Sequence, residues 1–408
     1  MSLNTITLPS RYWVFVITYG TSLIGSWLQR VSAAWLVWQM TGSPTWVGVL
    51  SLSELGTSTL AAPIAGAVAD RLGERAILKT VTAIAVAYSA ILSIVVSLAP
   101  PPLFIWVAGS ILVGILNGFQ GPARFSFIAS LVEKNQMTRA AAYNSLILNT
   151  AVFVGPVTAG FLLGTGPAWV PFALNAFATL TFLATLTVIQ SAQSPKAPIK
   201  DNWFRQISSG FMYTIKSRAL GPVFFLLIAV SFSARCLMEM MPSLVGLLFD
   251  GYPSTLSLLS GSIASGAFVG GLAISRIRNE ISHYKMLAVA GFLSAVTLLV
   301  FAGGGNILLA VPVLFTLGAS LAANGIASET IFQMNVEPPF RGRAMSLYGM
   351  AVRGAPALGA VTIGSMFQCL GLSLSLTLSG FSIFVCTATF IYKVHSSGID
   401  RKVANEIG

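Results

Sequence analysis

The sequence predicts an all-α membrane protein of twelve transmembrane helices, arranged as two pseudo-symmetric six-helix bundles. Of its 408 residues, 55% are hydrophobic and only 9% are charged, whereas about a quarter of the residues of a soluble domain are charged. Apolar runs of about 20 residues, the length that crosses a bilayer, recur along the whole chain. One long polar connection divides them into two sets of six.

The predicted spans are separated by short connections rich in Gly, Pro and Ser, such as 100–102 and 303–305. The first apolar run is too long for the core of a cleaved signal peptide, so we expect a retained helix there. The twelve predicted spans are 12–40, 44–69, 77–98, 103–123, 138–163, 168–190, 219–247, 254–275, 284–302, 307–329, 343–367 and 372–393.

The long connection sets the predicted domain boundaries. We expect an N-terminal six-helix bundle at 1–190, a cytoplasmic linker at 191–218 and a C-terminal six-helix bundle at 219–408. Within the linker, large apolar residues recur every four positions beside basic ones, which predicts an amphipathic helix on the bilayer surface. Those apolar residues are Trp203, Ile207, Phe211 and Ile215.

The two halves also resemble a repeat. Arg30 and Arg235 lie 205 positions apart, and the same offset relates Arg71 to Arg276. An offset of 204 relates Arg139 to Arg343.

Basic residues predict the orientation in the membrane. Of the 23 Lys and Arg, 20 fall in the N-terminal lead, in connections on one side, in the linker or in the tail, and the opposite connections contain none. By the positive-inside rule, both termini and the linker are cytoplasmic. We expect a multi-pass protein of a bacterial inner (cytoplasmic) membrane, with the lipid bilayer as a partner. The net charge of +11 is therefore topological, and nucleic acid is not an expected partner.

Two motifs resemble signatures of the major facilitator superfamily. The segment after the second span contains Gly66, Asp70, Arg71, Gly73 and Arg75, and resembles the helix 2–3 signature of that family with Glu74 replacing one basic residue. In the fifth span, Gly155, Pro156 and Gly160 resemble the antiporter signature of the family, with Ala159 replacing a glycine. The resemblance implies the major facilitator fold, with a gating role for the first motif and alternating access.

A wider pattern resembles the drug:proton antiporter branch, which includes the enterobactin and other siderophore exporters. The resemblance covers essentially the whole chain and implies proton-coupled efflux. Where many exporters carry a basic residue for proton coupling in helix 4, this chain has Asn117. The pattern is carried by Trp35, Thr41-Gly42-Ser43-Pro44, Gly121-Pro122-Ala-Arg124 and Arg341-Gly342-Arg343-Ala-Met-Ser346.

Other function classes fit the residues less well. The chain contains no G-x-x-x-x-G-K-[ST] motif, so an ion gradient rather than ATP is the expected energy source. Both histidines, His283 and His395, fall outside the predicted spans, which leaves no intramembrane Ser/His or zinc constellation. We therefore expect no enzyme activity, no cofactor and no metal.

Charged side chains inside the predicted spans mark the candidate site. Each costs on the order of 2.5–3.5 kcal/mol at the bilayer centre on insertion scales, so each indicates a pair or a cavity. Glu54 and Arg353 both fall near the predicted midplane, and we predict that Glu54 carries the proton with Arg353 as its alternating partner. A fixed bridge between the two is the structural alternative. Glu239 is the second proton-coupling candidate.

The remaining charges have their own alternatives. Arg235 and Glu239 are four residues apart, so an ion pair on one helix face competes with a functional role. Arg30 has no acid in its own predicted span, so its partner must come from another helix or from the substrate.

The charges also rank the substrates. Three deep arginines against two deep acids favour an anionic or zwitterionic small molecule, such as a siderophore, over a hydrophobic cation. The alternatives are multidrug efflux of hydrophobic compounds and import of an anionic nutrient. We expect a monomer. The substrate-binding candidates are Arg30, Arg235, Arg353, Asn117 and Asn149.

Overall fold

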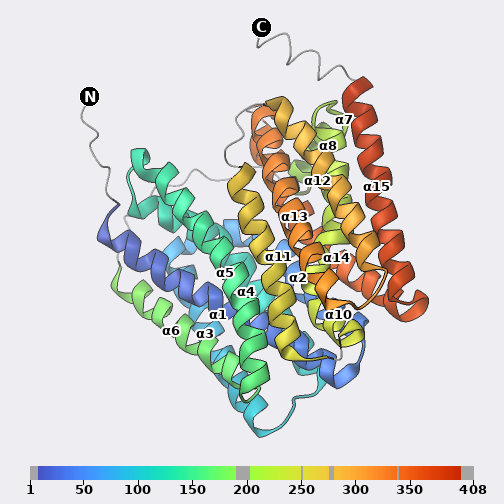
Figure 1. The fold of residues 1–408 in the computed structure, drawn as a ribbon. Coiled ribbons are helices and arrows are strands. Elements are labelled where there is room, and N and C mark those ends of the chain that lie inside the picture. Colours follow the sequence, from blue (N-terminus) through green and yellow to red (C-terminus); the bar gives the residue numbers. More distant parts are fainter. Residues whose placement is uncertain (1–7, 190–202, 250, 275–279, 338–339, 397–408) are drawn as a thin grey trace. The chain divides into compact units, whose positions relative to one another are not determined.

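The computed structural model describes residues 8–189, 203–249, 251–274, 280–337 and 340–396, and these contain helices but no strand (Figure 1). Each predicted span falls on a helix or on a run of shorter helices. The helices up to the linker are α1 (Ser10–Thr41), α2 (Pro44–Leu72), α3 (Glu74–Leu98), α4 (Leu103–Leu131), η1 (Lys134–Gln136), α5 (Met137–Thr165) and α6 (Val170–Val188).

The linker contains one helix, and the rest of the chain follows it. The predicted amphipathic segment forms α7 (Trp203–Lys216). The later helices are α8 (Leu220–Val230), η2 (Ser231–Arg235), α9 (Cys236–Glu239), α10 (Met241–Leu248), α11 (Pro253–Ile274), α12 (Glu280–Phe301), α13 (Ile307–Asn335), α14 (Arg341–Leu370) and α15 (Leu372–Ser396).

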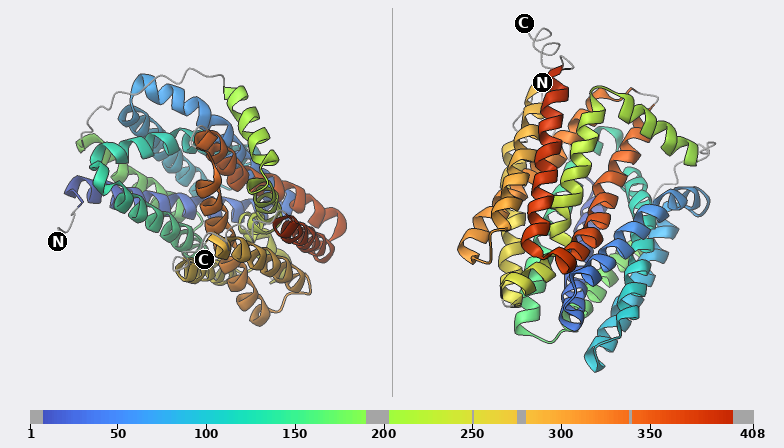
Figure 2. Two further views of the ribbon diagram at one scale, coloured as in Figure 1. Left: turned by 90° about the horizontal axis from the view of Figure 1, so that it is seen from above. Right: turned by 90° about the vertical axis from the view of Figure 1, so that its right-hand side faces the viewer.

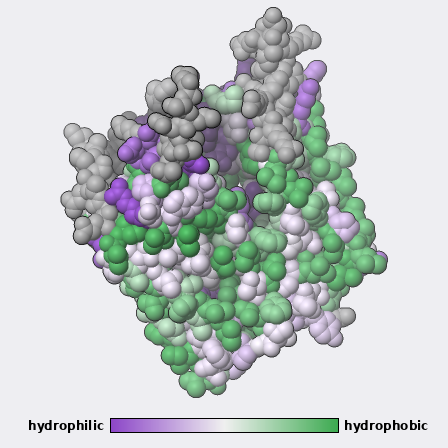
Figure 3. All heavy atoms as spheres, turned by 60° about the vertical axis from the view of Figure 1, so that its left-hand side comes forward, coloured by the Kyte–Doolittle hydropathy of each residue, from purple (hydrophilic) through white to green (hydrophobic). Residues whose placement is uncertain are grey.

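Ten of the described helices or helix runs are long and apolar enough to cross a membrane. Helices α1 and α2 are not among them, so the count of twelve spans stays a prediction. Both helices carry charged side chains that belong to the site described below. Hydrophobic residues cover most of the face in Figure 3, which agrees with a multi-pass membrane protein.

The seventh predicted span is interrupted. After α8, residues Ser231–Arg235 form the π-helix η2, and the helical path breaks again at Met240 before α10. Pro242 lies in the first turn of α10, where its missing N–H leaves no hydrogen bond unmade. Short π segments are frequent at functional sites.

The chain divides into two compact units. Unit 1 comprises Met1–Val37 and Ser53–Lys200, and unit 2 comprises Trp38–Leu52 and Asp201–Gly408. The turn between α1 and α2 therefore belongs with the C-terminal helices. The boundaries expected from the sequence, 1–190, 191–218 and 219–408, stay a prediction.

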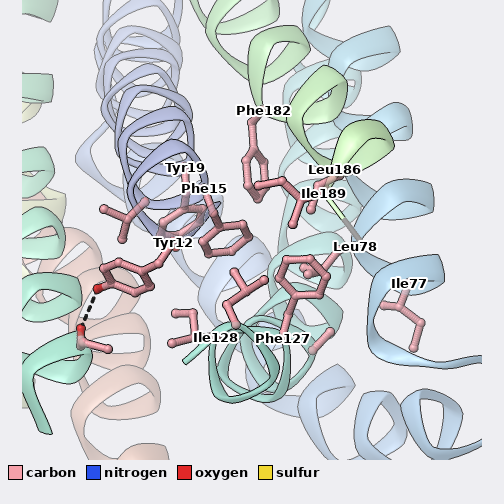
Figure 4. Packing of buried hydrophobic residues seen from close by; sticks show 14 of the residues in the cluster. Tyr12, Phe15, Tyr19, Ile77, Leu78, Phe127, Ile128, Phe182, Leu186 and Ile189 are labelled. Atoms are coloured by element: carbon pink, nitrogen blue, oxygen red, sulfur yellow. Dashed lines mark hydrogen bonds between the residues drawn. The ribbon is translucent and has the colours of Figure 1, made fainter. Parts of the chain in front are cut away.

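Unit 1 has an aromatic core (Figure 4). Phe15 of α1 packs against Phe127 of α4 and Phe182 of α6, with ring centroids 5.1 and 5.5 Å apart. The hydroxyl of Tyr12 donates a 2.8 Å hydrogen bond to the carbonyl oxygen of Ala140, which ties α1 to the start of α5. These contacts fix the end of α1 that precedes the site.

A buried polar network joins α1, α3 and α6 in the same unit. The amide nitrogen of Asn175 donates to Gln29 Oε1 at 2.9 Å and to Ser89 Oγ at 3.0 Å. Thr179 Oγ1 donates to Asn175 Oδ1 and also lies within hydrogen-bond distance of Ser22 Oγ. All these side chains are buried, so the network satisfies polar groups that would otherwise be costly in an apolar interior.

Glycines bring paired helices into close contact in each unit. In unit 1, a Cβ at Gly114 of α4 would overlap the carbonyl oxygen of Glu54 in α2. In unit 2, a Cβ at Gly318 of α13 would overlap the carbonyl oxygen of Ile263 in α11. The two glycines are related by the 204-residue offset noted above. Elsewhere in unit 2, α12 packs against both α13 and α15 (Figure 2).

Within unit 2, the turn between α1 and α2 packs on α14. A Cβ at Gly48 would overlap the backbone of Ala360. Gln368 donates to Ser43 Oγ at 2.6 Å and accepts from Thr45 Oγ1 at 2.7 Å. We call residues 38–52, which comprise the end of α1, the short connection and the start of α2, the α1–α2 turn.

Candidate functional site

The candidate site in unit 1 is built around the carboxylate of Glu54. This residue is only 9% exposed. Arg30 Nε lies 3.6 Å from Glu54 Oε2, and the amide nitrogen of Asn117 donates to Glu54 Oε1 at 3.3 Å. Three helices, α1, α2 and α4, thus each contribute one polar side chain to a single cluster.

Local packing explains why the cluster forms. Gly114 lies one turn before Asn117 on α4, and its lack of a side chain lets α4 approach α2 beside Glu54 and Thr57. The guanidinium of Arg30 also lies 5.2 Å from the ring centroid of Trp27, a cation–π contact on the same helix. Arg30 is therefore held by an acid from another helix and by an aromatic ring from its own.

The cluster combines a carboxylate, a guanidinium and an amide away from water. Removal of a carboxylate from water favours its protonated form, whereas a nearby guanidinium favours its ionised form. Such an acid can bind and release a proton when its distance from the cation changes. Within unit 1, Arg30 is a cation placed beside this acid. Arg353 lies on α14 in unit 2 with an exposed side chain, and its pairing with Glu54 stays a prediction.

In unit 2, Arg235 and Glu239 each contact other helices. Arg235 Nη2 donates to the carbonyl oxygen of Leu321 in α13 at 3.4 Å. Ser51 of the α1–α2 turn donates to Glu239 Oε2 at 3.2 Å. The i,i+4 ion pair considered from the sequence is therefore not the whole environment of either side chain.

The helix 2–3 motif spans the end of α2 and the start of α3, and only some of its side chains belong to the described part of the structure. Gly73 adopts φ +82°, a conformation that favours glycine, and separates α2 from α3. Arg75 donates from Nε to the carbonyl oxygen of Leu186 at 3.0 Å and from Nη2 to that of Thr187 at 2.7 Å, at the end of α6. The side chains of Asp70 and Arg71, and Gly66, lie outside the described part of the structure.

The remaining sequence candidates of unit 1 lie on α5. A Cβ at Gly155 would overlap the Trp27 side chain, so this glycine lets α5 approach α1. Pro156 and Gly160 are buried in the same helix. Asn149 is exposed, and its amide donates to Ser145 of its own helix at 2.9 Å.

Sequence reasoning missed two polar features. One is the Asn175 network. Two amide side chains inside apolar runs, Gln29 and Asn175, could have indicated it. The other is the set of contacts of the α1–α2 turn with Gln368, which no local pattern indicates because the partners are over 320 residues apart.

Comparisons with known proteins agree with this architecture. The staphyloferrin A transporter of Staphylococcus aureus is 23% identical over 90% of this chain and 92% of its own length. Macrolide efflux protein A of Streptococcus pyogenes is 21% identical over 93% of this chain and 94% of its own length. The enterobactin exporter of Citrobacter koseri is 23% identical over 67% of this chain and 66% of its own length.

Solved structures with the same fold are also transporters. A POT family transporter in complex with 5-aminolevulinic acid has a TM-score of 0.75 at 12% identity, over 95% of this chain and 97% of that one. The nucleoside transporter NupG has a TM-score of 0.69 at 15% identity, over 94% and 99% of the two chains. The family model described as transmembrane secretion effector matches residues 8–403. This chain therefore belongs to the transmembrane secretion effector family of the major facilitator superfamily, and it is a membrane transporter, not an enzyme.

Proposed function

We propose that this protein is a proton-coupled exporter of a small anionic or zwitterionic organic molecule, such as a siderophore. The observation that carries the proposal is the buried carboxylate of Glu54, held between Arg30 and Asn117. A titratable acid paired with a cation inside a transporter is the arrangement expected of a proton relay. The names of the staphyloferrin A and enterobactin relatives support a siderophore-like substrate.

The coupling follows from making and breaking the contact between Glu54 and a guanidinium. Contact with the guanidinium favours the ionised carboxylate, whereas loss of that contact in the buried site favours the protonated form. A conformational change that breaks the contact on one side of the membrane and restores it on the other gives each state its own affinity for the proton, as proton-driven exchange requires. Arg30 and, in the alternating arrangement, Arg353 are the proposed cations.

Counterflow in proteoliposomes separates this role from a structural one. Glu54→Gln should abolish uphill transport driven by a proton gradient and retain exchange of substrate down its own gradient. The matched control is Glu133→Gln, an exposed acid after α4 in the same unit, which should leave both activities unchanged. If Glu54→Gln still accumulates substrate with an unaltered pH dependence, the proton site lies elsewhere, and Glu239 is the next residue to replace.

Efflux of hydrophobic compounds is the second candidate function. The observation that favours it is the similarity to macrolide efflux protein A over nearly the whole chain. Deletion of the gene should raise the intracellular level of an acidic secreted metabolite under the first proposal. Efficient ethidium efflux that is lost in Glu54→Gln would favour the second.

The proposed location is the bacterial inner membrane with both termini in the cytoplasm. The distribution of Lys and Arg supports it. Reporter fusions after Gly42 and after Lys200 should then report opposite sides of the membrane. The same side for both would contradict twelve spans in this orientation.

A further inference from the structure

Unpartnered buried polar atoms gather where α8 and η2 meet α13 in unit 2. Ser231 Oγ and Arg235 Nε on one side have no hydrogen-bond partner among the described residues. On α13, neither amide atom of Asn324 nor Ser328 Oγ has one. Ser231 is 1% exposed, and Asn324 and Ser328 are fully buried. Native proteins rarely leave such groups unsatisfied, so this concentration indicates a missing ligand or water.

The helix register places these groups on one surface. Leu321, Asn324, Gly325 and Ser328 recur at i, i+3, i+4 and i+7, the spacing of a single helix face. Arg235 Nη2 contacts this face at the Leu321 carbonyl oxygen, and a Cβ at Gly325 would lie 3.4 Å from the same nitrogen. The guanidinium therefore lies against the face of α13 that carries Gly325.

A tyrosine of α14 also contacts this face of α13. Tyr348 of α14 donates to the carbonyl oxygen of Gly325 at 3.1 Å. The nearest acids along the two helices are Glu239, which accepts from Ser51, and Glu329, which accepts from Gln333 at 3.1 Å. Neither of these contacts provides a hydrogen-bond acceptor for Arg235 Nε.

We infer that Arg235, Asn324 and Ser328 form a binding site for the carboxylate of the transported molecule. The inference rests on the proposed export of an anionic substrate and assigns its recognition to this surface. A carboxylate offers acceptors for the Arg235 Nε, the Asn324 amide nitrogen and the Ser328 hydroxyl together. A cationic ligand would meet an unfavourable charge at Arg235. The π-helix η2 supplies the irregular backbone that carries this arginine.

A buried polar group without a partner destabilises the ligand-free protein. Replacing it with an apolar group should therefore stabilise that state and weaken ligand binding, whereas replacing a polar group that already has a partner should destabilise the protein and leave ligand binding unchanged. Asn324→Leu and Ser328→Ala are the diagnostic variants. Ser320→Ala is the matched control, because Ser320 lies on the same helix and is bonded to Ser294 at 2.9 Å.

The probe is sodium benzoate, with benzylamine as the ligand of opposite charge, and the readout is the thermal unfolding midpoint of the purified full chain. Benzoate should raise the midpoint of the parent protein, and benzylamine should not. Three variants, Asn324→Leu, Ser328→Ala and Arg235→Gln, should each raise the benzoate concentration that gives half of the midpoint shift. The expected increase is at least about tenfold, the equivalent of ~1.4 kcal/mol. Ser320→Ala should lower the ligand-free midpoint and leave the benzoate dependence unchanged.

Three results would overturn the site: equal effects of benzoate and benzylamine, an unchanged benzoate dependence in Asn324→Leu and Arg235→Gln, or no benzoate effect in the parent. The last result would assign the polar atoms to water. Because equilibrium binding does not need a proton gradient, Glu54→Gln should retain the benzoate effect. Benzoate binding by a parent protein that exports no acidic metabolite would reject the proposed function while keeping the site.

Discussion

Arg30 and Glu54 form an ion pair between α1 and α2, with 3.6 Å between Nε and Oε2. Removing one member of a buried pair leaves an uncompensated charge, which costs on the order of 3 kcal/mol. Arg30→Gln alone should therefore lower the unfolding midpoint and the abundance in membranes. The double variant Arg30→Gln with Glu54→Gln should recover stability without recovering proton-driven transport.

The recovery distinguishes two roles of the pair. If the double variant is as unstable as Arg30→Gln alone, the arginine stabilises unit 1 through Trp27 and not through Glu54. If the double variant transports substrate uphill, Glu54 does not carry the proton. The unfolding midpoint and the uphill transport are both measured on one set of purified proteins, the second after reconstitution in vesicles.

Gly114 allows the close approach of α4 to α2 that brings Asn117 to Glu54. Gly114→Val should force the helices apart and destabilise the protein by about 1–3 kcal/mol or more, with loss of folded material in size-exclusion chromatography. Gly121→Ala is the control on the same helix, because nothing lies within 4 Å of a Cβ there. Equal behaviour of the two variants would contradict the described α2–α4 contact.

Asn175 connects three helices through side-chain hydrogen bonds. Asn175→Leu would leave the buried groups of Gln29, Ser89 and Thr179 short of a partner, at a cost of roughly 1–3 kcal/mol. The unfolding midpoint should fall, while the substrate concentration at half-maximal transport should not change. A changed substrate dependence with unchanged stability would instead place the network in the transport pathway.

Arg75 and Asp70 belong to one motif but are expected to respond differently. Arg75→Ala removes two hydrogen bonds to the last carbonyl oxygens of α6, so it should lower stability by about 1 kcal/mol. Asp70→Asn should lower the transport rate and leave membrane abundance near that of the parent, as the gating role implied by the motif requires. Loss of abundance in Asp70→Asn, with the rate per folded molecule unchanged, would indicate a folding role.

The helices were predictable because each depends on local composition. Apolar runs of membrane-spanning length and the spacing of Phe211 and Ile215 in the linker correspond to helices in the structure. The π-helix at Ser231–Arg235 was not predicted, since hydropathy does not distinguish a π turn from an α turn.

The site depends on contacts that local patterns do not record. The sequence indicated that Glu54 and Arg30 matter, because charges in apolar runs are expensive. It did not indicate that they contact one another, because partner choice depends on how α1, α2 and α4 pack. The orphan groups on α13 were missed for the same reason: Asn324 and Ser328 are ordinary small polar residues until their burial is known.

The contacts of the α1–α2 turn limit where the chain can be divided into two fragments. Gln368 and Glu239 take hydrogen bonds from residues 38–52, which precede the linker by more than a hundred positions. A fragment that begins after the linker would leave this carboxylate and this amide without those hydrogen-bond partners. Complementation by co-expressed halves should therefore require the N-terminal fragment for the folding of its partner, not only for transport.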